Sequence, residues 1–186
     1  MKVHNLFAFI FFTFRTPTSS EYTILEYQGA SESETEPMVY AMNKLRRKIA
    51  KKRNVANMNE LTWDYRLEQI AETRITSCEA MQDGPDYMVS IAPTSKNVDS
   101  IFKLPREDQD KEILRLLGGL GAPGQTGFAC AEIWQPCTRS DGIEVRGVCL
   151  SGPRHTFTPL HYKHGPPGSK CPNGRKKKRG LCKLML

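Results

Sequence analysis

The six cysteines are the residues of this chain with the most distinctive chemistry. No two of them form a CxxC pair, and the set is Cys78, Cys130, Cys137, Cys149, Cys171 and Cys182. An even number without close pairs indicates three disulfide bonds in an exported chain. Zinc ligation is the alternative, and the missing CxxC spacing argues against it. The spacing alone leaves the pairing of the cysteines open.

The histidines offer a second kind of metal chemistry. His155, His161 and His164 all follow Cys149, and the last two are close enough in sequence to share a copper or zinc ion. A histidine pair in a loop rich in glycine and proline more often faces solvent. We therefore predict no metal ligands and no cofactor.

Motifs for catalysis are missing from the sequence. There is no Gly-x-Ser-x-Gly elbow, and the cysteines are expected to be oxidised. The carboxylates of Glu107, Asp108, Asp110 and Glu112 lie in a charged stretch that is typical of a solvated surface. Residues 118–121 lack the Gly-Lys-Ser/Thr ending of a phosphate-binding loop. We predict that the protein is not an enzyme and has no catalytic residues.

The N-terminus has the features of a signal peptide. Lys2 precedes an almost entirely apolar run, residues 6–14, which is too short to cross a bilayer. Residues 18–20 are small and offer a cleavage site. A buried N-terminal helix is the alternative, but the run has no polar face. We predict a signal peptide over 1–20, secretion to the extracellular space and no transmembrane anchor.

The densest run of charge lies near the C-terminus and is bracketed by Cys171 and Cys182. In a cytosolic protein it would indicate a nuclear localisation signal or nucleic-acid binding. In an exported chain, nucleic acid is not the expected partner, and a tethered basic loop attracts heparan sulfate or anionic lipid head groups. A loop that only adds solubility is the alternative, with equal weight. The predicted polyanion-binding residues are Lys170, Arg175, Lys176, Lys177, Lys178 and Arg179; Lys183 extends the run.

The elements that must position these residues fit one domain. The chain has 186 residues, a net charge of +7 and a mean hydropathy of −0.49. Its sequence has no glycine period, no sustained heptad and no long apolar span, which excludes collagen, coiled coils and polytopic membrane proteins. Residues 21–37 hold five glutamates and no basic residue, so we predict a flexible acidic leader. Pro37 then suits the first turn of a helix. Met42, Leu45 and Ile49 form its buried stripe, and most cations of residues 44–53 are expected on a solvated face.

Further elements follow from the same patterns. Asp64 is predicted to cap a second helix, with Trp63 packed before it as an apolar anchor. Five residues of that helix share one face, and Glu68 points away from it; the five are Leu67, Ile70, Ala71, Ile75 and Cys78. A short helix is predicted over 112–117, ended by two glycines. Strands are predicted over 128–134 and 143–150, joined by a turn at 140–142.

The order of these motifs resembles the CAP superfamily of cysteine-rich secretory, antigen 5 and pathogenesis-related proteins, including nematode SCP-like and venom-allergen-like secreted proteins. Residues 40–50 (YAMNKLRRKIA) resemble the opening helix of the family, and residues 57–67 (NMNELTWDYRL) resemble the entry to its second helix. GFACA at 127–131 resembles the Gly-Cys-Ala strand with residues inserted. GVCLSGP at 147–153 resembles the Val-Cys-Asn-Tyr-Gly-Pro signature, with Leu-Ser in place of Asn-Tyr. TPLHYKHGPP at 158–167 resembles the proline, aromatic and glycine segment that follows.

The resemblance implies an α+β fold, a three-layer α-β-α sandwich with a disulfide-stapled C-terminal extension. It implies a CAP-like (SCP) domain over 38–155 and an extension rich in glycine, proline and lysine over 156–186. It also implies the pairs Cys78–Cys137 and Cys130–Cys149, which leaves Cys171–Cys182. Each bridge adds about 2–4 kcal/mol in such domains.

The resemblance also shows what this sequence has lost. Many members of the family bind a metal with two histidines and two glutamates in a central cleft. Gln82 stands where the first histidine belongs, and residues 110–126 contain no histidine for the second. Glu107 or Glu112 is at most a remnant of one acidic position. The family's metal site is therefore expected to be lost.

The leading interpretation is a secreted CAP-like protein that acts by extracellular binding without catalysis. Its partner is an unknown extracellular protein or a lipid or sterol ligand, since some members of the family bind sterols or fatty acids. The alternatives are a module that binds a glycosaminoglycan or anionic lipid through residues 175–179, and a residual metal-dependent hydrolase.

Overall fold

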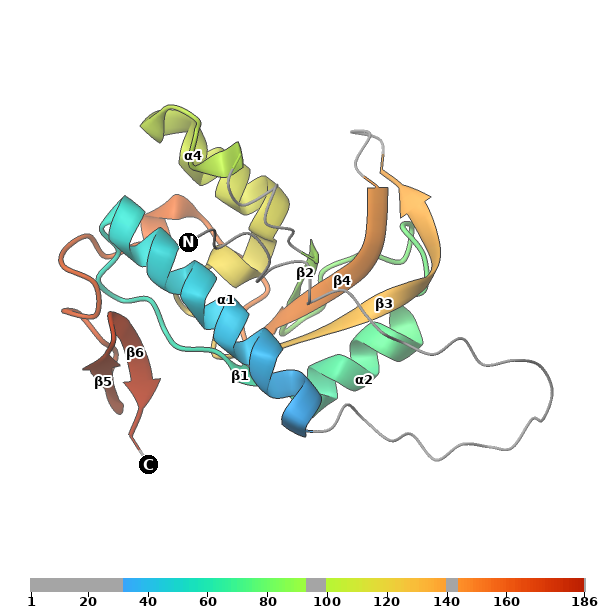
Figure 1. The fold of residues 1–186 in the computed structure, drawn as a ribbon, viewed down its shortest axis with the longest axis horizontal. Helices are drawn as coiled ribbons and strands as arrows, with labels where there is room; N and C mark the ends of the chain where they lie inside the picture. The colour runs from blue at the N-terminus through green and yellow to red at the C-terminus, as the bar shows by residue number, and fades with distance from the viewer. Residues whose placement is uncertain (1–31, 93–99, 140–143, 186) are drawn as a thin grey trace, which may run out of the picture.

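The computed structural model describes residues 32–92, 100–139 and 144–185. Its elements form three layers, with a four-stranded sheet between helices on both faces (Figure 1). The helix α1 (Glu32–Arg53) lies on one face, and α2 (Tyr65–Arg74) packs on the other against the two central strands. The fold is thus the α-β-α sandwich of α+β class that the sequence predicts. The predicted signal peptide, most of the leader and the turn at 140–142 lie outside the described residues.

The central sheet has the strand order β1-β3-β4-β2. Its long strands, β3 (Gly127–Thr138) and β4 (Glu144–Gly152), pair antiparallel, and Cys130 stands opposite Cys149. At one edge β1 (Thr62–Trp63) pairs parallel to β3, and at the other edge β2 (Met88–Ile91) pairs antiparallel to β4. Both central strands extend beyond the predicted ranges.

Helix α1 begins earlier than the sequence suggests. It starts at Glu32, so Pro37 lies inside it and not at its first turn, and the predicted leader is helical from residue 32 onward. Pro37 is the sixth residue of this helix and lies beyond the first four N–H groups that lack an intrahelical partner, so it removes one backbone hydrogen bond near the helix start. The predicted stripe is confirmed: Met42 and Leu45 are buried, and Ile49 is fully buried.

Helix α2 begins where the cap predicts. The carboxylate of Asp64 accepts hydrogen bonds from the backbone N–H groups of Arg66 at 3.0 Å and Leu67 at 3.2 Å. Trp63 packs edge-on against Phe128, with ring centroids 5.3 Å apart. One expectation was wrong: Glu68 is buried, because its carboxylate accepts a hydrogen bond from the indole N–H of Trp63 at 3.0 Å.

The region between β2 and β3 differs from the predicted single short helix. It contains α4 (Arg106–Glu112), a π-helical turn (η2, Ile113–Leu117) and a 3-10 turn (η3, Gly118–Gly121). The glycines do not end the helical segment. Gly118 has a φ of 46°, and the small residues of η3 allow it to press against β2 and β4, where a side chain on Gly119 would collide with Ser151.

Three disulfides join the described elements. Cys78–Cys137 ties the segment after α2 to the end of β3, with Cα atoms 6.0 Å apart. Cys130–Cys149 links the paired strands β3 and β4. Cys171–Cys182 closes the C-terminal segment, with Cα atoms 5.3 Å apart.

The C-terminal segment shares the core of the domain. It holds a 3-10 turn, η4 (Pro159–His161), and a hairpin of β5 (Arg175–Lys178) and β6 (Leu181–Leu184). Phe157, Tyr162 and Leu181 are buried in the same apolar cluster as the sheet and α1. Among the described residues, no helix is long and apolar enough to cross a membrane.

Candidate functional site

The positions expected to carry the family's metal ligands hold other chemistry. Gln82 is exposed, and its side-chain amide reaches only the backbone oxygen of Glu79, at 3.5 Å. The carboxylate of Asp110 pairs with the guanidinium of Arg53, and that of Glu112 pairs with Arg115 at 2.8 Å. Arg53 is therefore not one of the solvated cations that the sequence suggests. Its side chain is buried because it fastens the end of α1 to α4.

The three late histidines are all exposed. His161 lies against Phe157, with ring centroids 6.2 Å apart, and its Nδ1 accepts a hydrogen bond from the backbone N–H of Thr158 at 3.4 Å. His164 forms a backbone bridge with Val55. Within the described residues, no three histidines, cysteines or carboxylates gather into a group that could hold a metal ion, and every cysteine is in a disulfide.

The predicted polyanion residues gather on the β5–β6 hairpin and on the chain that leads to it. Lys176, Lys177 and Lys178 are exposed along β5, and Arg179 is exposed at the turn. The turn is tight, since Arg179 and Gly180 both have a positive φ, of 50° and 82°. Lys176 stands opposite Lys183 of β6, so both strands contribute cations.

Arg175 differs from the other predicted cations. Its guanidinium donates a hydrogen bond to the backbone oxygen of Cys182 at 3.0 Å, and the residue is half-buried. Burial lowers its pKa, and the nearby Glu60 partly offsets this effect. Arg175 therefore braces the hairpin from within, whereas Lys176, Lys177, Lys178 and Arg179 face solvent.

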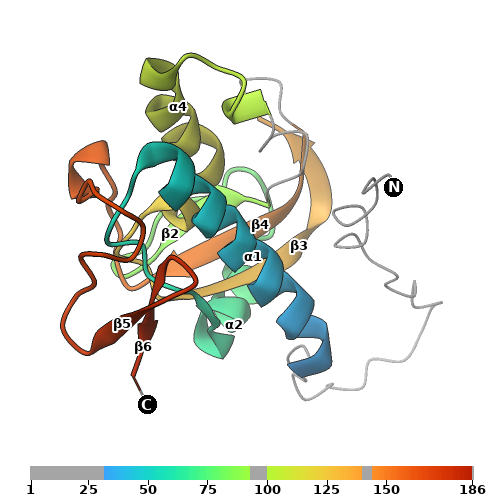
Figure 2. The ribbon, with the colours of Figure 1, turned by 60° about the vertical axis from the view of Figure 1, so that its left-hand side comes forward.

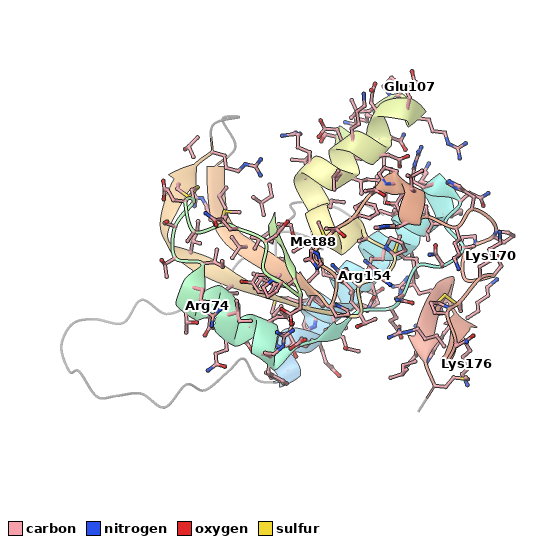
Figure 3. The ribbon with its side chains drawn as sticks, turned by 180° about the vertical axis from the view of Figure 1, so that it is seen from behind. Arg74, Met88, Glu107, Arg154, Lys170 and Lys176 are labelled. Carbon is pink, nitrogen blue, oxygen red and sulfur yellow. A yellow bond between two sulfur atoms is a disulfide. The ribbon has the colours of Figure 1, made fainter. Side chains whose placement is uncertain are left out.

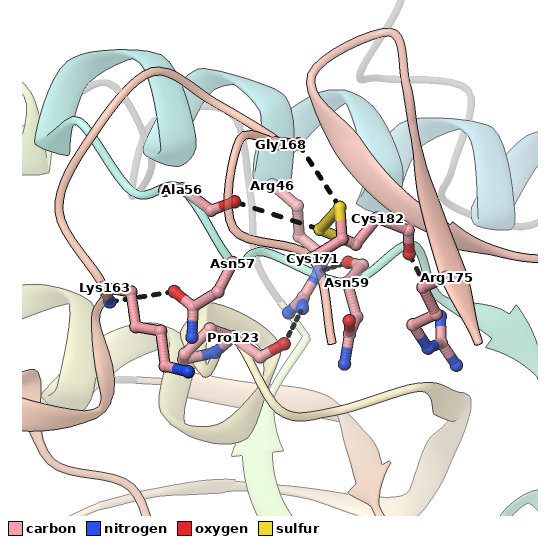
Figure 4. Close-up of a disulfide and its surroundings, with 10 residues drawn as sticks. All are labelled: Arg46, Ala56, Asn57, Asn59, Pro123, Lys163, Gly168, Cys171, Arg175 and Cys182. Atoms are coloured by element: carbon pink, nitrogen blue, oxygen red, sulfur yellow. Dashed lines mark hydrogen bonds between the residues drawn. A yellow bond between two sulfur atoms is a disulfide. The ribbon is translucent and has the colours of Figure 1, made fainter. Parts of the chain in front are cut away.

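The hairpin is fastened to the segment that follows α1. The backbone N–H of Cys182 donates to the oxygen of Met58 at 2.8 Å, and the N–H of Glu60 donates to the oxygen of Cys182 at 3.0 Å. The backbone N–H of Lys170 donates to the oxygen of Ala56 at 3.1 Å. Together with the Cys171–Cys182 disulfide, which Figure 4 shows, these bonds hold the cations on a fixed support.

The buried position of Arg46 could not be predicted from the sequence pattern. Arg46 belongs to the cations expected on a solvated face, but it is only 1% exposed. Its guanidinium donates to the backbone oxygens of Asn59 at 2.9 Å and Leu120 at 2.6 Å, with longer contacts of 3.5 Å to Pro123 and Gln125. Figure 4 shows Arg46 with Asn59 and Pro123. Burial lowers the pKa of Arg46 to about 9. Arg46 thereby joins α1 to two loops and has no part in the exposed basic surface.

A shallow hollow lies beside β1 on the described surface. It has a volume of about 430 Å³ and lies between residues 62–66 and the segments 126–127 and 152–153. Its polar groups already have partners in the protein. Asp64 caps α2, the indole N–H of Trp63 bonds to Glu68, and Arg66 pairs with Asp86 at 2.8 Å. The hollow shows no arrangement that would select a ligand.

Comparison with solved structures defines the class of fold. The hookworm platelet inhibitor aligns with a TM-score of 0.55 and 19% identity, over 89% of this chain and 99% of its own. NaASP2 with Zn²⁺ aligns with a TM-score of 0.49 and 17% identity, over 83% of this chain and 97% of its own. The Ancylostoma-secreted protein Ac-ASP-7 gives a TM-score of 0.49 and 18% identity, over 85% and 92%.

The alignment with the hookworm platelet inhibitor shows a divergent CAP-like fold, which confirms the resemblance read from the sequence at the level of the fold. No protein-family model and no curated protein sequence matches the chain.

Proposed function

We propose that the chain is a secreted protein that acts by extracellular binding and not by catalysis. One observation carries the proposal: the fold is kept, while an exposed Gln82 stands where the family resemblance places the first metal-binding histidine, and Glu112, at most a remnant of one acidic position, is paired with Arg115. The name of the hookworm platelet inhibitor, which says that it inhibits platelets, supports a role outside the cell.

The test is the metal content of the purified protein after dialysis against Zn²⁺ and Mn²⁺. We expect less than one ion per chain, with no change in the variants His161→Ala and His164→Ala. One firmly retained ion per chain, lost in both variants, would contradict the proposal and favour a residual metal-dependent hydrolase.

We propose polyanion binding through the hairpin as a second function, because the exposed lysines of β5 are held on a disulfide-closed support. Such a surface attracts sulfated polysaccharides by long-range electrostatics, which salt weakens. The natural partner in an extracellular setting is a glycosaminoglycan such as heparan sulfate.

Heparin chromatography tests this second function. The double variant Lys176→Gln, Lys178→Gln is expected to elute at clearly lower salt than the wild type, since both side chains are exposed. Arg175 is left intact because it braces the hairpin. Arg74→Gln, Lys103→Gln is the charge-matched control and is expected to elute as the wild type does. In Figure 3, Arg74 lies at the opposite end of the molecule from Lys176. If both variants elute at the same salt concentration, the hairpin is not the binding site.

A further inference from the structure

The most exposed large apolar side chain in the described part of the chain is Leu160. It is 92% exposed, whereas Tyr40, the next in exposure, is at 54%. Leu160 sits on the 3-10 turn η4, which projects from the body of the molecule in Figure 2. A single exposed leucine is common on protein surfaces. This one calls for an explanation only because of how it is held and what surrounds it.

Buried groups on both sides hold the turn in place. Phe157 and Tyr162 are each 5% exposed, and the hydroxyl of Tyr162 donates to the backbone oxygen of Gly121 at 3.3 Å. The side chain of Asn57 donates to the oxygen of His161 at 3.1 Å and accepts from the N–H of Lys163 at 2.9 Å. Leu160 is therefore presented to solvent by an anchored turn.

The beginning of the same loop is fixed by Gln125. This residue is fully buried, and its side-chain amide donates to the backbone oxygens of Ser151 at 3.1 Å and Arg154 at 2.7 Å. Its side-chain oxygen accepts from the N–H of Arg154 at 2.9 Å. The side chain of Arg154 remains exposed beside the loop that carries Leu160.

The segment that carries the turn is cationic. Residues 145–186 contain ten lysines and arginines and no aspartate or glutamate. Arg154 and Lys163 lie before and after the turn in the sequence and are exposed. Lys170 lies on the same side of the molecule as Lys176 of the hairpin (Figure 3). Two acids from other elements are engaged in contacts: Glu60 with Lys183 at 3.9 Å, and Asp110 with Arg53.

We propose that this end of the molecule docks on an anionic phospholipid bilayer, with Leu160 entering the boundary between head groups and acyl chains. The inference rests on the proposed extracellular binding function and names its partner class. A sulfated polysaccharide satisfies the cations but offers no hydrocarbon to an exposed leucine. An anionic bilayer supplies negative charge at its surface and apolar chains just beneath it.

The expected binding is weak and reversible. Loss of a leucine side chain that enters the bilayer lowers affinity about tenfold, and loss of one lysine near an anionic surface lowers it about fivefold. Binding to vesicles is therefore expected to need both the negative charge of the lipid and the side chain of Leu160. Binding to heparin needs the cations alone.

The test is co-sedimentation of the full-length secreted protein with vesicles. One set is phosphatidylcholine alone, and the other is phosphatidylcholine with phosphatidylserine in equal parts. The wild type is expected to bind the second set, and Leu160→Ala is expected to bind about tenfold more weakly. Leu104→Ala is the matched control on the segment before α4, 37% exposed in the wild type, and its binding is expected to be unchanged. Heparin elution is expected to be the same for all three proteins.

The variant Leu160→Trp adds a readout that does not depend on affinity. The emission of the introduced indole is expected to shift to the blue on the phosphatidylserine vesicles and to be quenched by lipids brominated in the acyl chain. The proposal is overturned if the wild type does not bind the phosphatidylserine vesicles or if Leu160→Ala binds them as tightly as the wild type does. It is also overturned if the emission of the Leu160→Trp variant is neither shifted to the blue nor quenched. If the protein binds heparin but not the vesicles, a lipid surface is not its partner, and the proposal of polyanion binding is unaffected.

Discussion

Arg46 shows at the scale of one residue how this fold holds its loops. A guanidinium fully removed from water is costly, and here backbone oxygens, mainly those of Asn59 and Leu120, compensate for the lost hydration. The planar fork of arginine suits this task, since it presents several N–H groups in fixed directions. The sequence pattern could not reveal it, because Arg46 stands among exposed cations such as Lys44 on the same helix.

Replacing Arg46 by methionine is expected to lower the free energy of unfolding by about 3 kcal/mol, because buried carbonyl oxygens lose their donors. Lys44→Met, at an exposed position of α1, is expected to change it by about 0.5 kcal/mol or less. Urea unfolding measures both. A variant Arg46→Met as stable as the wild type would show that the guanidinium is not needed to hold these loops.

Tyr162 gives a prediction for the dependence of stability on pH. Burial raises its pKa above the ordinary value of 10.0, so the folded protein keeps the phenolic proton at a pH where the unfolded chain releases it. The stability that Tyr162 contributes is present below pH 10 and is lost as pH rises further.

We expect Tyr162→Phe to be less stable than the wild type by about 1 kcal/mol near neutral pH, because the hydrogen bond to Gly121 is lost. Above pH 10 the difference is expected to shrink. Urea unfolding at neutral and alkaline pH measures it. A difference that stays constant as pH rises would mean that burial does not raise the pKa of Tyr162 in the folded state.

At the scale of elements, periodic patterns predict helices well and irregular segments poorly. The stripe of Met42 and Ile49 and the cap at Asp64 are local signals, and the structure confirms both. Glu68 escaped prediction because its partner, Trp63, precedes the helix and the pair forms only after the helix packs. The glycines after Leu117 suggested an end to the helix, yet close contact with β2 and β4 keeps that segment in helical turns.

Some residues of the candidate site could also be predicted from the sequence, and others could not. The exposed lysines of β5 could be found from charge alone, because a dense run of cations cannot be buried. The bracing role of Arg175 and the exposure of Leu160 depend on how the C-terminal segment packs against residues 54–60, which lie far away in sequence. Sequence periodicity does not indicate contacts between such distant segments.

At the scale of the whole molecule, two helical layers enclose one sheet, and the C-terminal hairpin is fastened beside the end of α1. Three disulfides cross this arrangement, one between helical and sheet segments, one within the sheet and one at the hairpin. The basic end with Leu160 lies on the segment that the third disulfide closes.

The central proposal is that the chain is a disulfide-stapled scaffold of CAP-like fold, and peptide mapping of the purified protein under non-reducing conditions tests it most directly. The account predicts three linked peptides, Cys78–Cys137, Cys130–Cys149 and Cys171–Cys182, and no free thiol. Free thiols at Cys78 and Cys137, or either of them linked to another cysteine, would contradict it.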